Sequence, residues 1–254
     1  MIFDTHAHYD DEAFDADRES LLSGMKEAGV EYIVNVGASM ASSGRSIALA
    51  EKYPFVYAAV GVHPDEVGEL DEEQIALLKE WSEHPKVKAI GEIGLDYYWD
   101  KEKHELQKRW FLRQMELAHE MGLPIIVHSR EAAKDTLDMI KAARPLELSG
   151  IVHCYSYSVE QAKEYLNMGY YLGIGGVLTF KNAKKLKEVA EYAPLSQIVL
   201  ETDCPYLAPV PYRGKRNDSS KIAYVAEELA SIKQVSTEEV LRVTNENGRK
   251  LYGI

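Results

Sequence analysis

Two histidines near the start of the chain, His6 and His8, have the spacing of a metal-binding pair. They follow the apolar residues Ile2 and Phe3, which predict a short buried strand. Side chains two residues apart on a strand point the same way, so both imidazoles face one point in space. Imidazole is a common ligand of divalent transition metals. An isolated pair of this kind more often serves packing than metal binding, so the prediction depends on what joins it.

Further candidate ligands follow later apolar runs of the sequence. The complete set at such positions is His6, His8, His63, Glu92, His128, His153 and Asp203. The remaining histidines, His84, His104 and His119, fall in loops or helices, and we interpret them as surface or packing residues. One strand-end histidine alone is as often structural as ligating. Several imidazoles and two carboxylates placed in this way seldom arise by chance, and together they predict a metal site.

The types of these side chains narrow the chemistry. Nitrogen and carboxylate ligands without thiolate suit Zn, Mn, Ni, Co or Fe, and to some extent Mg. Six of these residues, all except His63, are the predicted metal ligands, and six exceed the need of one tetrahedral ion. A carboxylate such as Glu92 can bridge two ions. Two ions about 3.5–4 Å apart can share a hydroxide and act on the attacking and leaving oxygens. We therefore expect two divalent cations, with Asp203 placed to ligate one and to take or return a proton.

Eight apolar, β-rich runs alternate with longer amphipathic runs along the chain. The predicted strands are 2–5, 32–37, 55–61, 87–91, 124–127, 150–152, 170–173 and 197–200. The predicted helices end near 26–29, span 39–53, 71–83, 102–121, 131–143, 158–167 and 182–192, and finish with 218–233 and 236–251. This order and length predict an α/β fold, a single-domain (β/α)8 TIM-type barrel over residues 1–254, with the metal site at the carboxyl-terminal rim of its strands. An open doubly wound sheet is the alternative, but no glycine-rich phosphate-binding motif follows the first strand.

The composition limits the class of protein. The 254 residues carry a net charge of −12, so a nucleic-acid partner would need bound metal and a local basic patch. No apolar run approaches the ~20 residues of a membrane span, and we see no signal peptide before the first strand. Two cysteines, Cys154 and Cys204, are too few for a disulfide framework. We expect a cytoplasmic location and interpret both cysteines as buried structural thiols.

Several cationic and aromatic residues follow the predicted strands and are candidates for substrate binding. We assign this role to His63, Arg130, Arg213 and Arg216. The last two lie in Arg213-Gly214-Lys215-Arg216-Asn217, where the cations can contact phosphate. Tyr97, Tyr98 and Trp99 can equally stack a base or pack within their loop. The lysines from 181 to 187 are better explained as a solvated helix face.

The sequence resembles the TatD family of metal-dependent deoxyribonucleases, within the wider amidohydrolase superfamily. The matching segments are Asp4-Thr5-His6-Ala7-His8, Gly61-Val62-His63-Pro64, Gly91-Glu92-Ile93-Gly94-Leu95-Asp96, His128-Ser129-Arg130, His153-Cys154, Glu201-Thr202-Asp203-Cys204-Pro205-Tyr206-Leu207 and Arg213-Gly214-Lys215-Arg216-Asn217. The resemblance implies a TIM-type barrel, two divalent metals and hydrolysis of phosphodiester bonds in DNA. It implies His6, His8, Glu92 and Asp203 around one metal, and Glu92, His128 and His153 around the other. The chain departs from the family pattern at Tyr155-Ser156-Tyr157 and at Asp218-Ser219, which affects substrate preference more than chemistry.

Three hypotheses about function follow. The first is a metal-dependent hydrolase that cleaves phosphodiester bonds in DNA, as an exonuclease that prefers single strands. The second keeps the metal site but hydrolyses an amide, ester or lactone bond in a small molecule, which the net charge of −12 favours slightly. The third is a non-enzymatic scaffold that binds partners or stores metal, and the intact ligand set argues against it. No obligate protein partner and no membrane association are expected.

Overall fold

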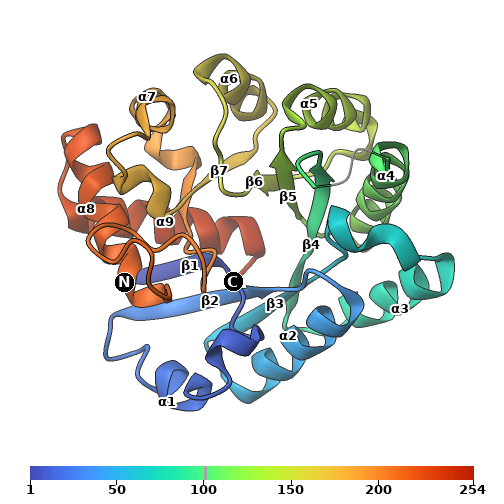
Figure 1. Ribbon diagram of the computed structural model, residues 1–254, viewed down its shortest axis with the longest axis horizontal. Coiled ribbons are helices and arrows are strands. Elements are labelled where there is room, and N and C mark those ends of the chain that lie inside the picture. The colour runs from blue at the N-terminus through green and yellow to red at the C-terminus, as the bar shows by residue number, and fades with distance from the viewer. Residues whose placement is uncertain (100–101) are drawn as a thin grey trace. The chain divides into compact units, whose positions relative to one another are not determined.

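The computed structural model describes residues 1–99 and 102–254 (Figure 1). Its eight strands form one sheet in the order β1-β2-β3-β4-β5-β6-β7-β8, and the pairs β1–β2, β3–β4, β4–β5, β5–β6 and β7–β8 are parallel. Helices alternate with these strands along the chain. This sequential, parallel arrangement is that of a (β/α)8 barrel, which confirms the predicted fold class. No helix within the described residues is both long and apolar enough to cross a membrane.

The chain divides into two compact units. The first unit comprises Met1–Asn35, Cys154–Lys250 and Ile254, and the second comprises Val36–His153 and Leu251–Gly253. A single domain over residues 1–254 stays a prediction, and the units are described one at a time below.

The first unit contains both ends of the sheet order. Its strands are β1 (Ile2–Ala7), β2 (Val30–Val36), β7 (Tyr171–Ile174) and β8 (Ile198–Leu200). Its helices are α1 (Arg18–Ser23), α6 (Val159–Asn167), α7 (Lys184–Tyr192), α8 (Ile222–Lys233) and α9 (Thr237–Tyr252), with 3-10 turns η1 (Glu12–Phe14), η4 (Gly176–Thr179), η5 (Leu195–Gln197) and η6 (Ser219–Lys221). Helix α1 is shorter than predicted, since it stops before Gly24, a residue with low helix propensity.

The second unit contains the middle of the sheet order. Its strands are β3 (Val56–Val60), β4 (Val87–Asp96), β5 (Ile125–Arg130) and β6 (Gly150–Val152). Its helices are α2 (Met40–Lys52), α3 (Glu72–Ser82), α4 (His104–Met121) and α5 (Ala133–Ala142), with 3-10 turns η2 (Pro64–Glu69) and η3 (Arg144–Leu146). Helices α3, α4 and α5 follow one another outside β4 and β5 (Figure 1). Strand β4 continues to Asp96, beyond its predicted end, so Glu92 lies within the strand rather than after it.

Local sequence signals explain where several helices begin and end. The predicted cap Ser39 accepts a hydrogen bond from the Ser42 N–H at the start of α2. Asp71 and Gln74 form a capping box at the start of α3. Helix α4 ends at Gly122, whose φ of 65° lies in the left-handed region that glycine adopts without strain. By fixing where the helices begin and end, these signals also set where the connections to the ligand-bearing strands begin and end.

The strands are buried on both faces, as parallel barrel strands are expected to be. All six residues of β1 are buried, and so are all but one of the ten residues of β4. Close strand packing depends on glycine at several sites, which include Gly61 and Gly173. A Cβ at Gly61 would lie 2.9 Å from the Gly91 carbonyl carbon, and one at Gly173 would lie 2.3 Å from Glu201 Oε2. The second contact leaves room for a buried carboxylate beside the candidate ligands.

Candidate metal centre

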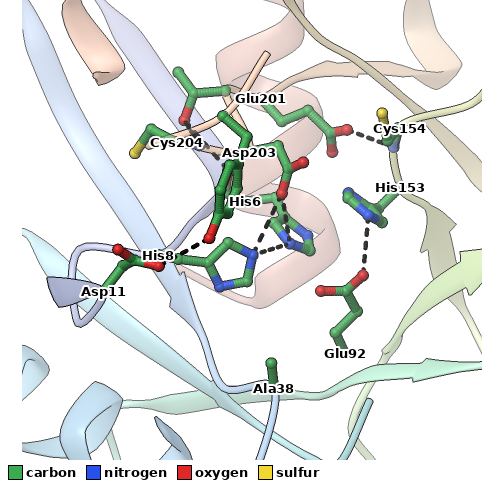
Figure 2. Close-up of polar contacts among 12 residues, drawn as sticks. His6, His8, Asp11, Ala38, Glu92, His153, Cys154, Glu201, Asp203 and Cys204 are labelled. Carbon is green, nitrogen blue, oxygen red and sulfur yellow. Dashed lines mark hydrogen bonds and ion pairs between the residues drawn. The ribbon is translucent and has the colours of Figure 1, made fainter. Parts of the chain in front are cut away.

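Three predicted ligands of the first unit converge at the end of β1. His6 Nε2 lies 3.0 Å from His8 Nε2, and Asp203 Oδ1 lies 3.3 Å from His8 Nε2 and 3.8 Å from His6 Nε2. Figure 2 shows the two imidazoles and this carboxylate turned toward one another. We call His6, His8 and Asp203 the first-unit cluster.

Backbone contacts fix the position of Asp203 relative to β1. The Asp203 N–H donates to the His6 carbonyl at 2.9 Å, and the His8 N–H donates to the Cys204 carbonyl at 2.9 Å. Asp203 has a φ of 56°, in the left-handed region. Reciprocal backbone bonds thus bring a ligand from far along the sequence to the two histidines.

A buried carboxylate that the sequence prediction did not assign supports the first-unit cluster. Asp4 accepts hydrogen bonds from the Thr202 N–H at 3.0 Å, the Thr202 hydroxyl at 2.7 Å and the Ser219 hydroxyl at 2.6 Å. Burial raises the pKa of Asp4 to about 7, although these hydrogen bonds oppose the shift. Asp4 has the same strand parity as His6, so the alternation of side chains could have identified it.

In the second unit, three imidazoles surround one carboxylate. Glu92 Oε1 lies 2.7 Å from His128 Nδ1, 3.0 Å from His153 Nε2 and 3.8 Å from His63 Nε2. The contact between Glu92 and His153 is drawn in Figure 2. These residues come from β4, β5 and the segments after β6 and β3. We call Glu92, His128, His153 and His63 the second-unit cluster.

A second carboxylate, Asp96, holds the other side of His128. Asp96 Oδ2 lies 3.1 Å from His128 Nε2, and Asp96 Oδ1 accepts from the Tyr98 N–H at 2.8 Å. Burial alone would raise the pKa of Asp96, but the hydrogen bonds from His128 and Tyr98 lower it overall. Burial likewise opposes protonation of His128, yet its bonds to Asp96 and Glu92 raise its pKa. Asp96 ends the motif Gly91–Asp96, but the sequence prediction gave it no role. Its strand parity with Glu92 is the signal that could have identified it.

His63 lies among the ligands, although the sequence prediction placed it in substrate binding. Its ring centroid is 4.3 Å from that of His128. Burial, reinforced by the charge of His128, lowers the pKa of His63 to about 3. The imidazole is therefore neutral near pH 7, with a nitrogen lone pair available to a metal or a substrate proton.

Both clusters fit a divalent ion by type and spacing of donors. Ligands about 2.0–2.2 Å from a tetrahedral ion lie about 3.3–3.6 Å from one another. The donor atoms of His6, His8 and Asp203 lie within 4.8 Å of one another, and so do those of His63, Glu92 and His128. The supporting contact from Asp96 to His128 is the kind that orients metal-binding histidines. The donor sets contain nitrogen and oxygen only.

Both cysteines lie beside the clusters but outside the donor sets. Cys204 is fully buried, and burial raises the pKa of its thiol well above the usual value. The Cys154 N–H donates to Glu201 Oε1, as Figure 2 shows. Glu201 is fully buried and was not assigned by the sequence prediction. It acts on the backbone just after His153 and explains why β7 carries Gly173.

The three arginines predicted to bind substrate differ in the partners that they already have within the protein. Arg216 donates to both carboxylate oxygens of Asp17, at 2.8 and 2.6 Å, and to the Ala13 carbonyl at 2.7 Å. The Arg213 guanidinium lies 4.3 Å from the Phe180 ring centroid. The Arg130 guanidinium lies 3.9 Å from the Tyr98 ring centroid.

A hollow of about 1040 Å³ lies in the first unit. It is bounded by the segment after His8 and by the segment after Asp203. Its apolar and cationic lining includes Phe180, Tyr206, Leu207, Arg213 and Lys215, and its acidic lining includes Asp11, Glu12 and Asp15. The hollow therefore offers groups of both charges beside the first-unit cluster.

Known proteins resemble this chain over its whole length. The family described as TatD related DNase matches residues 3–253. The chain belongs to the TatD family. YabD of Bacillus subtilis (strain 168), an uncharacterized metal-dependent hydrolase, is 45% identical over 254 residues, which cover 100% of both proteins. YcfH of Escherichia coli (strain K12), described in the same words, is 33% identical over 257 residues, covering 100% of this chain and 96% of YcfH.

The structural comparison agrees with the sequence comparison. The crystal structure of YjjV, a TatD homologue from Escherichia coli K12, matches with a TM-score of 0.93 and 31% identity. The match covers 100% of this chain and 98% of that one. The resemblance inferred from the sequence motifs is thus confirmed. The protein is a metal-dependent hydrolase with the TatD barrel.

Proposed function

We propose that this TatD-family hydrolase cleaves phosphodiester bonds in DNA, as an exonuclease that prefers single strands. The observation that carries the proposal is the pair of nitrogen-and-carboxylate clusters, His6–His8–Asp203 and Glu92–His128–His153. The description of the matching family as a DNase supports DNA as the substrate.

The proposal includes two divalent ions, one held by each cluster, chosen from Mg, Mn, Zn, Ni and Co. Bound there, such ions supply Lewis acidity and a water of lowered pKa. His6, His8 and Asp203 would hold one ion, and Glu92, His128 and His153 the other. Asp203, whose side chain is 20% exposed, is the group assigned to take and return a proton. Glu92 is assigned to the catalytic set because the imidazoles converge on it.

Four residues are proposed to bind substrate: His63, Arg130, Arg213 and Arg216. Neutral His63 offers a nitrogen beside Glu92, and Arg130 and Arg213 offer cations to phosphate oxygens. Arg216 is already bound by Asp17, so its proposed contribution to substrate binding is smaller than that of Arg213. Lys215 lines the same hollow as Arg213 and extends this cationic side.

The test is nucleotide release from a 3′- or 5′-labelled single-stranded oligonucleotide with added Mn²⁺ or Mg²⁺. We expect release by the wild-type protein and loss of release in His128→Ala, with the same protein in EDTA as a blank. The exposed Glu69→Gln variant serves as a matched control for purification and folding. Equal release by wild type and His128→Ala would contradict the proposal, because a contaminating nuclease would then explain the activity.

A second candidate, hydrolysis of a small-molecule amide, ester or lactone, uses the same clusters. The acidic side of the first-unit hollow, with Asp11, Glu12 and Asp15, favours it because these carboxylates repel phosphate. A substrate panel of amides, lactones and phosphodiesters separates the two. Turnover of a lactone or amide with no phosphodiester cleavage would select the second candidate.

A further inference from the structure

Two large aromatic side chains stand on the surface just after β4. Trp99 is 67% exposed and Tyr98 is 47% exposed. Their ring centroids are 4.6 Å apart with the planes nearly perpendicular. The Arg130 guanidinium lies 3.9 Å from the Tyr98 ring centroid and 5.4 Å from that of Trp99. Tyr98, Trp99 and Arg130 thus form an exposed group of three planar side chains, which we call the aromatic platform.

The base of this loop is anchored, so the platform is not a loose surface segment. Tyr97 turns inward, where its hydroxyl donates to Asp135 at 2.8 Å and its ring stacks on His104 at 3.6 Å. The Tyr97 N–H donates to the Arg130 carbonyl at 2.9 Å. The three aromatic residues therefore differ in environment. Tyr97 packs within the protein, whereas Tyr98 and Trp99 face solvent and are available to stack a base.

One carboxylate connects the platform to the second-unit cluster. Asp96 contacts His128 Nε2 through Oδ2 and the Tyr98 N–H through Oδ1. Gln107 of α4 fixes the Asp96 backbone, accepting from its N–H at 3.0 Å and donating to its carbonyl at 2.9 Å. Arg130 itself follows His128 by two residues on β5. The platform is therefore held next to a proposed metal ligand by short, partly buried hydrogen bonds.

The charge of the platform suits an anionic, planar ligand. Arg130 forms no ion pair with any residue that the structure describes, whereas Arg216 is neutralised by Asp17. A hollow of about 330 Å³, lined by Pro64, Asp65 and Trp99 among others, adjoins the platform. Bases of single strands stack on exposed aromatic rings, and arginine adds cation–π and phosphate contacts. Bases within a duplex are already stacked on one another and do not offer their faces.

We propose that the aromatic platform binds an unpaired nucleobase of a DNA single strand, with Trp99 as the stacking surface and Arg130 at the adjacent phosphate. This inference rests on the proposed function and specifies the source of its single-strand preference. It assigns Tyr98 and Trp99 to substrate binding, a role that their position after Asp96 makes possible. A protein partner is the other occupant such a surface can take, and it is an outcome of the test.

The test measures binding of the metal-free protein, in EDTA, to a fluorescent ten-residue oligothymidylate by anisotropy. A second oligonucleotide of equal length and charge carries abasic sites in place of its bases. We expect Trp99→Ala to weaken binding of the oligothymidylate by about 5- to 150-fold and Trp99→Phe to restore most of it. We expect Arg130→Gln to weaken binding of both oligonucleotides, because it removes a phosphate contact.

The matched control is Tyr192→Ala. Tyr192 is 49% exposed and has the Lys163 amine 4.9 Å from its ring centroid. It lies at the end of helix α7 rather than after a strand, and it belongs to the other unit. We expect its affinity to stay within about twofold of wild type, since it loses no base contact. We expect the abasic oligonucleotide to bind wild type and Trp99→Ala equally.

Two outcomes would overturn the platform proposal. One is equal affinity of wild type and Trp99→Ala for oligothymidylate, including no binding by either, which would leave the surface to a protein partner. The other is an equal loss on both oligonucleotides, which would show that Trp99 acts without a base. Cleavage is measured on the same samples after adding Mn²⁺ in excess of the EDTA. Base-dependent binding without cleavage would contradict the proposed function and leave the platform intact.

Discussion

The first-unit cluster takes two of its three ligands from one stretch of chain, whereas every ligand of the second-unit cluster comes from a different strand or strand end. His6 and His8 are brought together by strand alternation alone, and Asp203 joins them through backbone bonds. Glu92, His128 and His153 meet only because β4, β5 and β6 pair in register. The pair His6 and His8 should therefore tolerate a shift of neighbouring strands better than Glu92, His128 and His153, whose meeting depends on the register of three strands.

The two clusters also differ in where their carboxylate lies. Asp203 is at the edge of the first-unit cluster, with its side chain 20% exposed. Glu92 is at the centre of the second-unit cluster, with its side chain 6% exposed and imidazoles around one of its oxygens. Removing the central carboxylate should therefore disturb more ligands at once than removing any single histidine.

The largest effect is expected for Glu92→Gln. The amide has almost the same shape but no charge, so the histidines lose the anion that they surround. We expect loss of metal from the second-unit cluster and a fall in hydrolysis of more than about 100-fold, since a direct ligand should count for more than a supporting residue. Metal content by plasma mass spectrometry and turnover of a chromogenic phosphodiester are the measurements. Full metal content in this variant would refute the central role of Glu92.

A somewhat smaller effect is expected for single histidines, and it tests whether the clusters are independent. His8→Ala should remove the ion of the first-unit cluster only, and His128→Ala the ion of the second-unit cluster only, because each histidine belongs to one donor set. Titration with Mn²⁺ in each variant measures the remaining sites. If either substitution abolishes both sites, the clusters bind metal as one unit and the comparison above fails.

Asp96→Asn should have a moderate effect that is confined to the second-unit cluster. The amide can still meet His128 Nε2 but removes the charge that holds the imidazole in place. We expect metal affinity to fall by about 10- to 100-fold, the usual consequence of losing a carboxylate behind a ligand histidine. Asp138→Asn is the control, because the Asp138 carboxylate pairs with Lys134 on the surface of α5 and belongs to neither cluster. Equal losses in both variants would point to general electrostatics instead.

Asp4→Ala should cost stability rather than metal affinity, because Asp4 supports the first-unit cluster through Thr202 and Ser219 and not through an imidazole. The substitution leaves a buried N–H and two hydroxyls without their acceptor, which should lower the free energy of unfolding by at least about 2 kcal/mol. Urea unfolding of the metal-free protein measures it. Asp71→Ala, which removes the cap of α3, is the comparison and should cost about 1 kcal/mol. A smaller loss for Asp4→Ala than for Asp71→Ala would contradict this role.

The contrast between locally specified features and features that need distant parts of the chain also explains what the sequence could predict. Apolar runs and their caps located every strand and helix of the barrel, because short buried strands and capped helices are local features. Strand ends also predicted His6, His8, His128 and His153, and the structure places these histidines in two clusters, one in each unit. The inner support of the site was not found: Asp4, Asp96 and Glu201 bond to backbone or to ligands, and those partners become visible only in three dimensions.

Contacts between residues far apart in sequence also decide which of the predicted site residues already have partners. His63 was predicted to bind substrate, and the structure places its Nε2 3.8 Å from Glu92 Oε1 and its ring 4.3 Å from that of His128. Arg216 lies in a basic motif, but Asp17, 199 residues away, occupies its guanidinium. A prediction from composition and motifs treats such a cation as free to bind phosphate. Only the folded chain shows which charges are already paired.

The smallest effect is expected for Arg216→Ala, and it separates the two arginines of the basic motif. Arg216 and Asp17 are both more than a third exposed, so their ion pair is screened by water. We expect a melting temperature lower by about 2 °C or less and less than about a twofold loss of oligonucleotide affinity. Arg213→Ala should weaken that affinity more, because the Arg213 guanidinium faces Phe180 in the hollow and is not held by an acid of the described chain. Anisotropy at two salt concentrations measures both variants, since a lost phosphate contact also reduces the salt dependence. A reduced salt dependence in Arg216→Ala but not in Arg213→Ala would reverse the assignment and make Arg216 the phosphate contact.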